Sequence, residues 1–99
     1  MNVRFLEAAR DDLRDAVAFY EAERPGLGAE LVKEVRSAVE RITKLPEAWQ
    51  PLSPNTRRCR TQRFPYGVIY RVMGDEILIA AVAHLHREPG YWMDRLPRP

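Results

Sequence analysis

The sequence predicts an α+β fold in which a hairpin of two helices packs on a small, mostly antiparallel sheet. Apolar residues recur at helical spacing through the first half of the chain, with one Pro/Gly break at residues 23–28. In the second half the apolar period changes to two, which is the period of a strand. A chain of 99 residues forms one modest core, so we expect a single domain over residues 1–99 with the element order β-α-α-β-β-β.

The first predicted elements are a short strand and an amphipathic helix. The segment "NVRF" at residues 2–5 is typical of a strand. The apolar residues that follow share one face of a helix: Leu6, Ala9, Leu13, Ala16, Val17 and Tyr20. The segment "ERPGLG" at residues 23–28 then ends this helix, because proline and two glycines do not continue it.

A second amphipathic helix follows and completes an αα-hairpin. Its apolar face comprises Leu31, Val35, Ala38, Val39, Ile42 and Leu45. Pro46 ends this helix. The segment "PEAWQPLSPN" at residues 46–55 has three prolines and no regular period, so we expect an irregular loop there.

The C-terminal half predicts strands. Val68, Tyr70 and Val72 alternate with the residues between them, and "GDE" at 74–76 is a turn. The next segment, "ILIAAVAHLH" at 77–86, is apolar on both faces, as in a strand that is buried on both faces. The helical hairpin can cover only one of them. Either a partner or the C-terminal segment "REPGYWMDRL" must cover the other.

Positive charge is concentrated in the second half of the chain. Residues 1–50 carry eight basic and ten acidic side chains, whereas residues 51–99 carry eight and four. No acidic residue lies between Pro51 and Gly74, where five arginines occur: Arg57, Arg58, Arg60, Arg63 and Arg71. This separation indicates a negatively charged partner, either nucleic acid or an acidic protein segment. The alternative is a solvated basic face, but Arg outnumbers Lys 14 to 2, and arginine suits bidentate recognition.

Side-chain alternation in a strand places Arg58 and Arg60 on one face and Cys59 and Thr61 on the other. Cys59 is the only cysteine, so it forms no internal disulfide, which fits a reducing compartment. We expect it to be a small core residue rather than a reactive thiol. No apolar run approaches the roughly 18–20 residues of a membrane span, and charges occupy the N-terminus where a signal peptide would be apolar. We therefore expect a cytoplasmic protein without membrane association.

The sequence contains no Gly-rich phosphate loop, no CxxC pair and no spacing typical of a Ser-His-Asp triad. His84 and His86 could share one side of a strand, but two ligands at this spacing are weak support for a metal site, and we predict neither metal nor cofactor. Together with Arg87, Tyr91 and Trp92 they gather proton-transfer groups, a cation and aromatic rings, as RNA cleavage requires. The alternative, which residue type alone favours, is that Tyr91 and Trp92 cap the open edge of the core.

Two segments carry a resemblance to a known family. "RFPYGVIYRVMGDEILIAAVAHLHREPGYW" resembles the second half of RelE/ParE-family toxins of bacterial type II toxin–antitoxin modules, and "FYEAERPGLGAELVKEV" resembles their first half. The resemblance implies a toxin that a cognate antitoxin holds inactive in a hetero-oligomer, with the antitoxin's C-terminal segment wrapped around it. Because such segments are commonly acidic, the five arginines and Trp92 become candidates for binding the antitoxin or the cellular target.

The family divides by activity. RelE-like members cut mRNA on the ribosome, and the resemblance would then assign His84, Arg87 and Tyr91 to catalysis. ParE-like members inhibit DNA gyrase without such a set. In cutting members an arginine typically follows the aromatic residue at the start of the third strand, whereas here Gly67 follows Tyr66. The cutting members are also lysine-rich, and this chain is not. The sequence therefore favours a ParE-like toxin, with a ribonuclease and a module that has lost toxicity as the alternatives.

Overall fold

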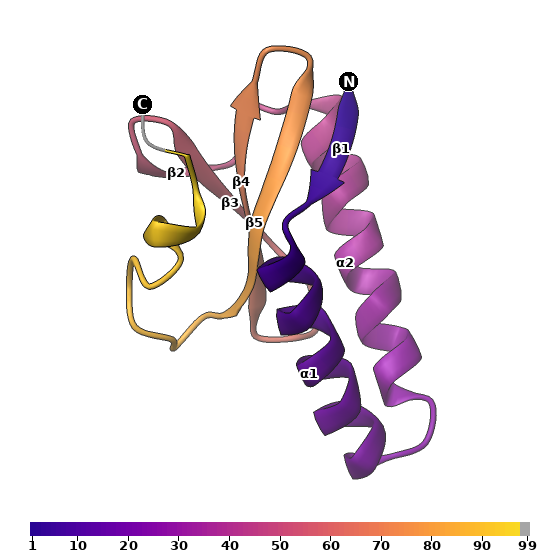
Figure 1. Ribbon diagram of the computed structural model, residues 1–99. Coiled ribbons are helices and arrows are strands. Elements are labelled where there is room, and N and C mark those ends of the chain that lie inside the picture. Colours follow the sequence, from indigo (N-terminus) through magenta and orange to yellow (C-terminus); the bar gives the residue numbers. More distant parts are fainter. Residues whose placement is uncertain (98–99) are drawn as a thin grey trace.

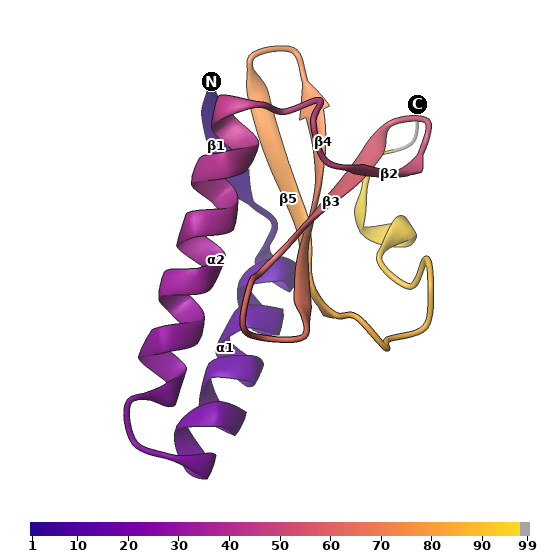
Figure 2. The ribbon, with the colours of Figure 1, turned by 180° about the vertical axis from the view of Figure 1, so that it is seen from behind.

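The computed structural model describes residues 1–97 and has three layers. The αα-hairpin covers one face of a five-stranded sheet, and the C-terminal segment covers the other (Figure 1). Seen from behind, the two helices run side by side along the sheet and extend past its lower end (Figure 2). This arrangement confirms the α+β prediction.

The elements follow the predicted order with one addition. They are β1 (Asn2–Phe5), α1 (Glu7–Glu23), α2 (Leu27–Lys44), β2 (Gln50–Ser53), β3 (Thr56–Arg60), β4 (Tyr66–Met73), β5 (Glu76–His84) and a 3-10 turn (Met93–Arg95). The strand order is β1-β5-β4-β3-β2, with β1 parallel to β5 and all other pairs antiparallel. Neither helix of the described chain has the length and apolarity that a membrane crossing requires.

The added element is β2, which lies in the segment predicted to be an irregular loop. Pro51 pairs with Arg57 at the outer edge of the sheet, and a register shift separates Pro51 from Ser53. Proline is tolerated in an edge strand because its missing N–H would face solvent. Because of its prolines, this segment was predicted to be a loop, although it forms a short edge strand.

The turn of the αα-hairpin is fixed by a carboxylate at the end of α1. Glu21 accepts hydrogen bonds from the backbone N–H groups of Gly26 and Gly28, at distances of 2.9 to 3.1 Å. Gly26 has φ +90°, a conformation that side-chain-bearing residues rarely adopt. A Cβ on Gly28 would lie 2.9 Å from Val17, so glycine also permits the close packing of the two helices.

The main core lies between the helices and the sheet. It includes the predicted helix positions Ala9, Ala16, Leu31, Val35, Ala38 and Ile42, which meet Val68, Tyr70, Ile77, Ile79 and Val82. Cys59 is 1% exposed in this core, as predicted. Burial raises the pKa of its thiol, with Arg41 opposing the shift, which makes the thiolate less accessible.

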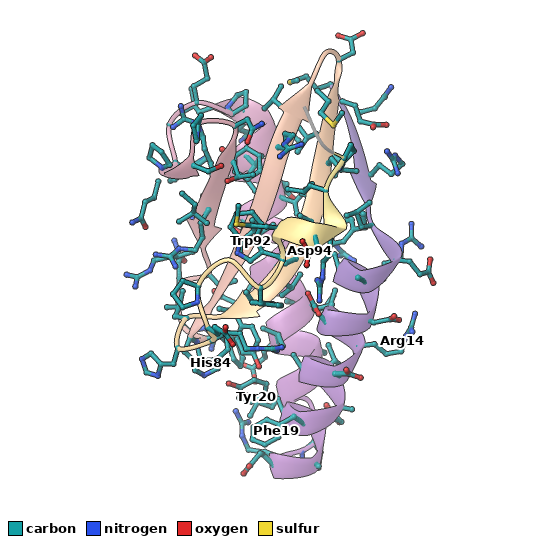
Figure 3. All side chains as sticks on the ribbon, turned by 60° about the vertical axis from the view of Figure 1, so that its left-hand side comes forward. Arg14, Phe19, Tyr20, His84, Trp92 and Asp94 are labelled. Carbon is teal, nitrogen blue, oxygen red and sulfur yellow. The ribbon has the colours of Figure 1, made fainter. Side chains whose placement is uncertain are left out.

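A second, smaller core forms on the opposite face of the sheet. Trp92 and Leu96 of the C-terminal segment pack against Ile69, Leu78, Ala80, Ala81 and Ala83. Of the two occupants expected for this face, the C-terminal segment is therefore the one present, and strand β5 needs no partner to bury its second face. Trp92 lies between the C-terminal turn and the sheet (Figure 3).

Candidate functional site

Three of the five arginines in residues 57–71, all but Arg58 and Arg60, bind backbone carbonyls or carboxylates of other parts of the chain. Arg57 donates to the carbonyl oxygen of Trp49 at 2.8 Å. Arg71 donates to the carbonyl oxygen of Pro97 at 2.7 Å and thereby holds the C-terminal segment. Arg63 pairs with two carboxylates of α2. A binding role for these three remains a prediction, but each already has a structural one.

The contacts of Arg63 tie the β3–β4 loop to helix α2. Its guanidinium lies 3.0 Å from a carboxylate oxygen of Glu30 and 3.4 Å from one of Glu34. Glu34 also accepts the backbone N–H groups of Gln62 and Arg63. Burial opposes ionisation of Glu34, but these hydrogen bonds outweigh it and lower its pKa. The loop is therefore anchored to the helix by a group that must stay ionised.

Arg58 and Arg60 are the two arginines that the predicted alternation assigns to the face opposite Cys59. Arg60 is exposed, and Cys59 between them is buried on the helix side. The Arg58 side chain crosses the neighbouring strand at Gly67, where a Cβ would lie 2.6 Å from its Cδ and 2.7 Å from its Cγ. Gly67 therefore leaves room for the stem of Arg58. Arg58 thus reaches over β4 from β3 at a position that has no side chain of its own.

The guanidinium of Arg58 has hydrogen-bond partners for only some of its N–H groups. Its Nη2 donates to the side-chain oxygen of Gln50 at 2.8 Å. Its Nε is buried and has no hydrogen-bond partner within residues 1–97. Burial, together with the positive charge of Arg60, lowers the pKa of Arg58. The guanidinium thus lies in a setting that disfavours its charge, with a neutral amide as its acceptor.

Arg58 lines a groove of about 410 Å³ between the sheet and the C-terminal segment, which we name the strap groove. Its lining comprises Leu52, Ser53, Arg58, Ile69, residues 83–85 and residues 87–93. The apolar side chains of its lining include Ile69, Ala83 and Leu85, together with the exposed Leu52 and Met93. Arg58, His84 and Arg87 supply its basic groups, and Glu88 is its acidic residue.

The candidate catalytic residues His84, Arg87 and Tyr91 all line the strap groove. The Arg87 guanidinium lies 4.1 Å from the centre of the Tyr91 ring, and that of Arg95 lies 5.2 Å from it. Burial and the nearby Asp12 carboxylate raise the pKa of Tyr91 despite both cations. His84 accepts the backbone N–H of His86 on its Nδ1 at 3.1 Å. The structure therefore brings the three predicted residues together, but several of their groups already have intramolecular partners.

Trp92 and His86, the other two residues of the cluster selected from the sequence, contact other side chains of the protein. Trp92 is 6% exposed, so its indole mainly supports the second core while one side borders the strap groove. His86 packs against His84 with 5.2 Å between ring centres and a tilt of 60° between the rings. Across residues 1–97, no three His, Cys, Asp or Glu side chains come together as a metal site would require.

Comparison with known proteins decides the family. A family model described as "ParE toxin of type II toxin-antitoxin system, parDE" matches residues 3–89. The chain belongs to the ParE toxin family. A solved structure described as the chromosomal ParDE toxin–antitoxin system from P. aeruginosa is similar to this ParE-family chain, with a TM-score of 0.75 and 22% identity. The match covers 85% of this chain and 95% of that one. A search of curated proteins gave no match.

Membership in a type II toxin–antitoxin family implies a cognate antitoxin as partner. The strap groove of this ParE-family chain includes residues that the sequence argument did not select, namely Leu52, Glu88 and Met93, with Gln50 bound to Arg58 beside it. The proline-rich segment around Gln50 gave no strand signal. Glu88 lies inside the selected segment 84–92 and Met93 directly after it, but the nuclease hypothesis gave neither residue a role.

Proposed function

We propose that this ParE-family protein is the toxin of a type II toxin–antitoxin pair and that it arrests growth by binding DNA gyrase, without catalysing a reaction itself. A cognate antitoxin neutralises it. The proposal combines the family match over residues 3–89 with the contents of the strap groove.

The observation that carries the non-enzymatic part is the crossing of Arg58 over Gly67. Phosphoryl transfer requires cations directed at the place where charge develops. Position 67 has no side chain, the aliphatic stem of Arg58 fills the space beside it, and the Arg58 guanidinium donates to Gln50 at the edge of the sheet. The groove thus lacks the arginine on β4 that the resemblance associates with mRNA cleavage.

The setting of Tyr91 supports the same proposal. Its ring lies within cation–π distance of Arg87 and Arg95, so the aromatic face has a structural use that is independent of the hydroxyl group. Phenylalanine would keep that face. The pKa of Tyr91 is raised, which makes its hydroxyl a weaker acid at neutral pH.

The second candidate function is mRNA cleavage on the ribosome. One observation favours it: His84, Arg87 and Tyr91, a proton-transfer group, a cation and a phenol, line one groove. A nuclease that uses the Tyr91 hydroxyl for proton transfer would lose about 100-fold or more in rate without it. A paired module without toxicity is the third reading, and it predicts no growth arrest at all.

The experiment is induction of the wild-type chain and of Tyr91→Phe in cells without antitoxin, with growth, primer extension on mRNA and chromosomal DNA breaks measured together. We expect both proteins to arrest growth and to produce DNA breaks without new mRNA ends. Arrest by the wild type and its loss in a folded Tyr91→Phe variant, with discrete mRNA ends, would favour the nuclease instead.

A further inference from the structure

We propose that the strap groove is a docking site for an acidic, aliphatic segment of the antitoxin, and that one carboxylate of this segment binds Arg58 in place of Gln50. The inference rests on the proposed toxin–antitoxin function. It assigns a specific acceptor and a specific chemistry to a face of the molecule that the family match leaves unassigned.

The first argument is the geometry of the Arg58 guanidinium. Its Nη2 and Nε hydrogens point along the same edge of the planar group, which is the edge that a carboxylate binds with two parallel hydrogen bonds. In the free protein Nη2 donates to Gln50 and Nε has no partner within the described chain. A single amide oxygen leaves half of this edge unused. A carboxylate that displaces Gln50 would bind both donors.

The second argument is the charge of Arg58. Arg58 forms no ion pair within residues 1–97, whereas Arg63 and Arg95 in the same half of the chain each pair with a carboxylate. Burial already disfavours the charged form of Arg58, and Arg60 adds repulsion. An incoming carboxylate would offset both costs, because an ion pair in a partly buried setting is screened less than one in water.

The third argument decides what kind of chain carries the carboxylate. Ile69, Ala83 and Leu85 line the groove, and the exposed side chains of Leu52 and Met93 border it. Aliphatic side chains of a peptide would bury this surface, whereas a phosphodiester backbone would not. Glu88 also lines the groove and would repel a chain with a charge on every residue. A peptide that alternates acidic and aliphatic residues fits both features.

The test uses the product of the neighbouring gene, purified with this chain and then separated from it, in titrations at low and high salt. Arg58→Met keeps a stem that packs over Gly67 and removes the guanidinium. We expect it to weaken binding about tenfold or more and to reduce the salt dependence. Arg36→Met is the control: this exposed arginine of α2 lies outside the groove lining, and we expect the affinity of this variant to stay within about twofold of the wild type.

Gln50→Glu provides a second test that does not depend on Arg58 being replaced. The new carboxylate would bind the Arg58 edge from within the chain, so we expect weaker antitoxin binding together with unchanged or higher thermal stability. Gln50→Ala removes the competing amide, and we expect wild-type affinity or slightly tighter binding. These two variants change an exposed side chain, so they test the proposal even if Arg58→Met folds poorly.

The outcomes separate the inference from the proposed function. Antitoxin binding that is unaffected by Arg58→Met and Gln50→Glu would overturn the docking site and leave the toxin–antitoxin assignment intact. Failure of any neighbouring gene product to bind would overturn both. A 12-nucleotide single-stranded RNA is titrated in parallel. If it binds and Arg58→Met abolishes its binding alone, the groove takes nucleic acid and the proposal is wrong.

Discussion

Asp12 on α1 and Arg95 in the C-terminal 3-10 turn form a two-pronged ion pair, with Oδ2–Nη1 at 2.7 Å and Oδ1–Nη2 at 3.1 Å. Asp12 Oδ2 also accepts the backbone N–H of Val82, and Arg95 Nη1 also donates to the carbonyl oxygen of Ala80. One ion pair therefore links the helix, strand β5 and the C-terminal segment. It contacts β5 at Ala80 and Val82, next to the register shift between Ile69 and Tyr70 in the β4–β5 pairing.

Removal of this pair should loosen the C-terminal segment. Both side chains are largely buried, so Arg95→Met leaves Asp12 without its counterion, and we expect a loss of about 1–3 kcal/mol in the free energy of unfolding. The measurement is urea unfolding. Arg14→Met is the control, since it breaks the exposed Arg14–Asp11 pair and should change stability by no more than about 0.5 kcal/mol. Equal effects of the two variants would contradict the role assigned to Arg95.

The Gly67→Ala variant tests the crossing of Arg58 over β4. The new Cβ would overlap the Arg58 stem, so we expect a loss of about 1–3 kcal/mol in unfolding free energy. In an Arg58→Ala background the stem is absent, and the same change at residue 67 should cost much less. A double-mutant cycle measures this coupling. Additive effects would show that Arg58 does not occupy this space.

Stability should fall at high pH, with Tyr70 as one cause. Burial raises the pKa of Tyr70 to about 12, against an ordinary value of 10.0, and Arg57 opposes the shift. The buried neutral phenol therefore contributes stability that is complete below pH 10 and is lost as the pH rises from 10 to about 12. Tyr70→Phe removes this titration together with the hydrogen bond to the Pro46 carbonyl oxygen. We expect it to be less stable by about 1 kcal/mol at neutral pH and to show a shallower alkaline decline. A decline as steep as that of the wild type would rule out Tyr70 as its source.

The sequence predicted most of the fold because its signals are local. The apolar periods of α1 and α2, the break at Gly26 and the alternation in β4 depend on neighbouring residues alone. Strand β2 was missed because Pro51 in an edge strand looks the same as proline in a loop. The sequence left two candidates for covering the second face of β5, a partner or the C-terminal segment. Only the packing of Trp92 in the structure decided between them.

The candidate site was less predictable. The cluster of His84, Arg87 and Tyr91 could be selected because the three residues are close in the sequence. The hydrogen-bond partners of the arginines could not be predicted, because the fold brings them together from distant parts of the sequence. These pairs are Arg57 with Trp49, Arg63 with Glu34, and Arg71 with Pro97. Residue type identified the arginines as a candidate recognition surface, but only the folded structure distinguishes an arginine that anchors a loop from one whose acceptor is a neutral amide.

The measurement that tests the central claim most directly is a supercoiling assay with purified gyrase, relaxed plasmid and the antitoxin-free protein. We predict inhibition that rises with protein concentration, is reversed by the antitoxin, and is retained within about threefold by Tyr91→Phe, because no proton transfer by this hydroxyl is involved. The same protein added to translating ribosomes should leave the mRNA intact. Unimpaired supercoiling at every concentration, with mRNA cut in the ribosome reaction and Tyr91→Phe inactive there, would contradict the account.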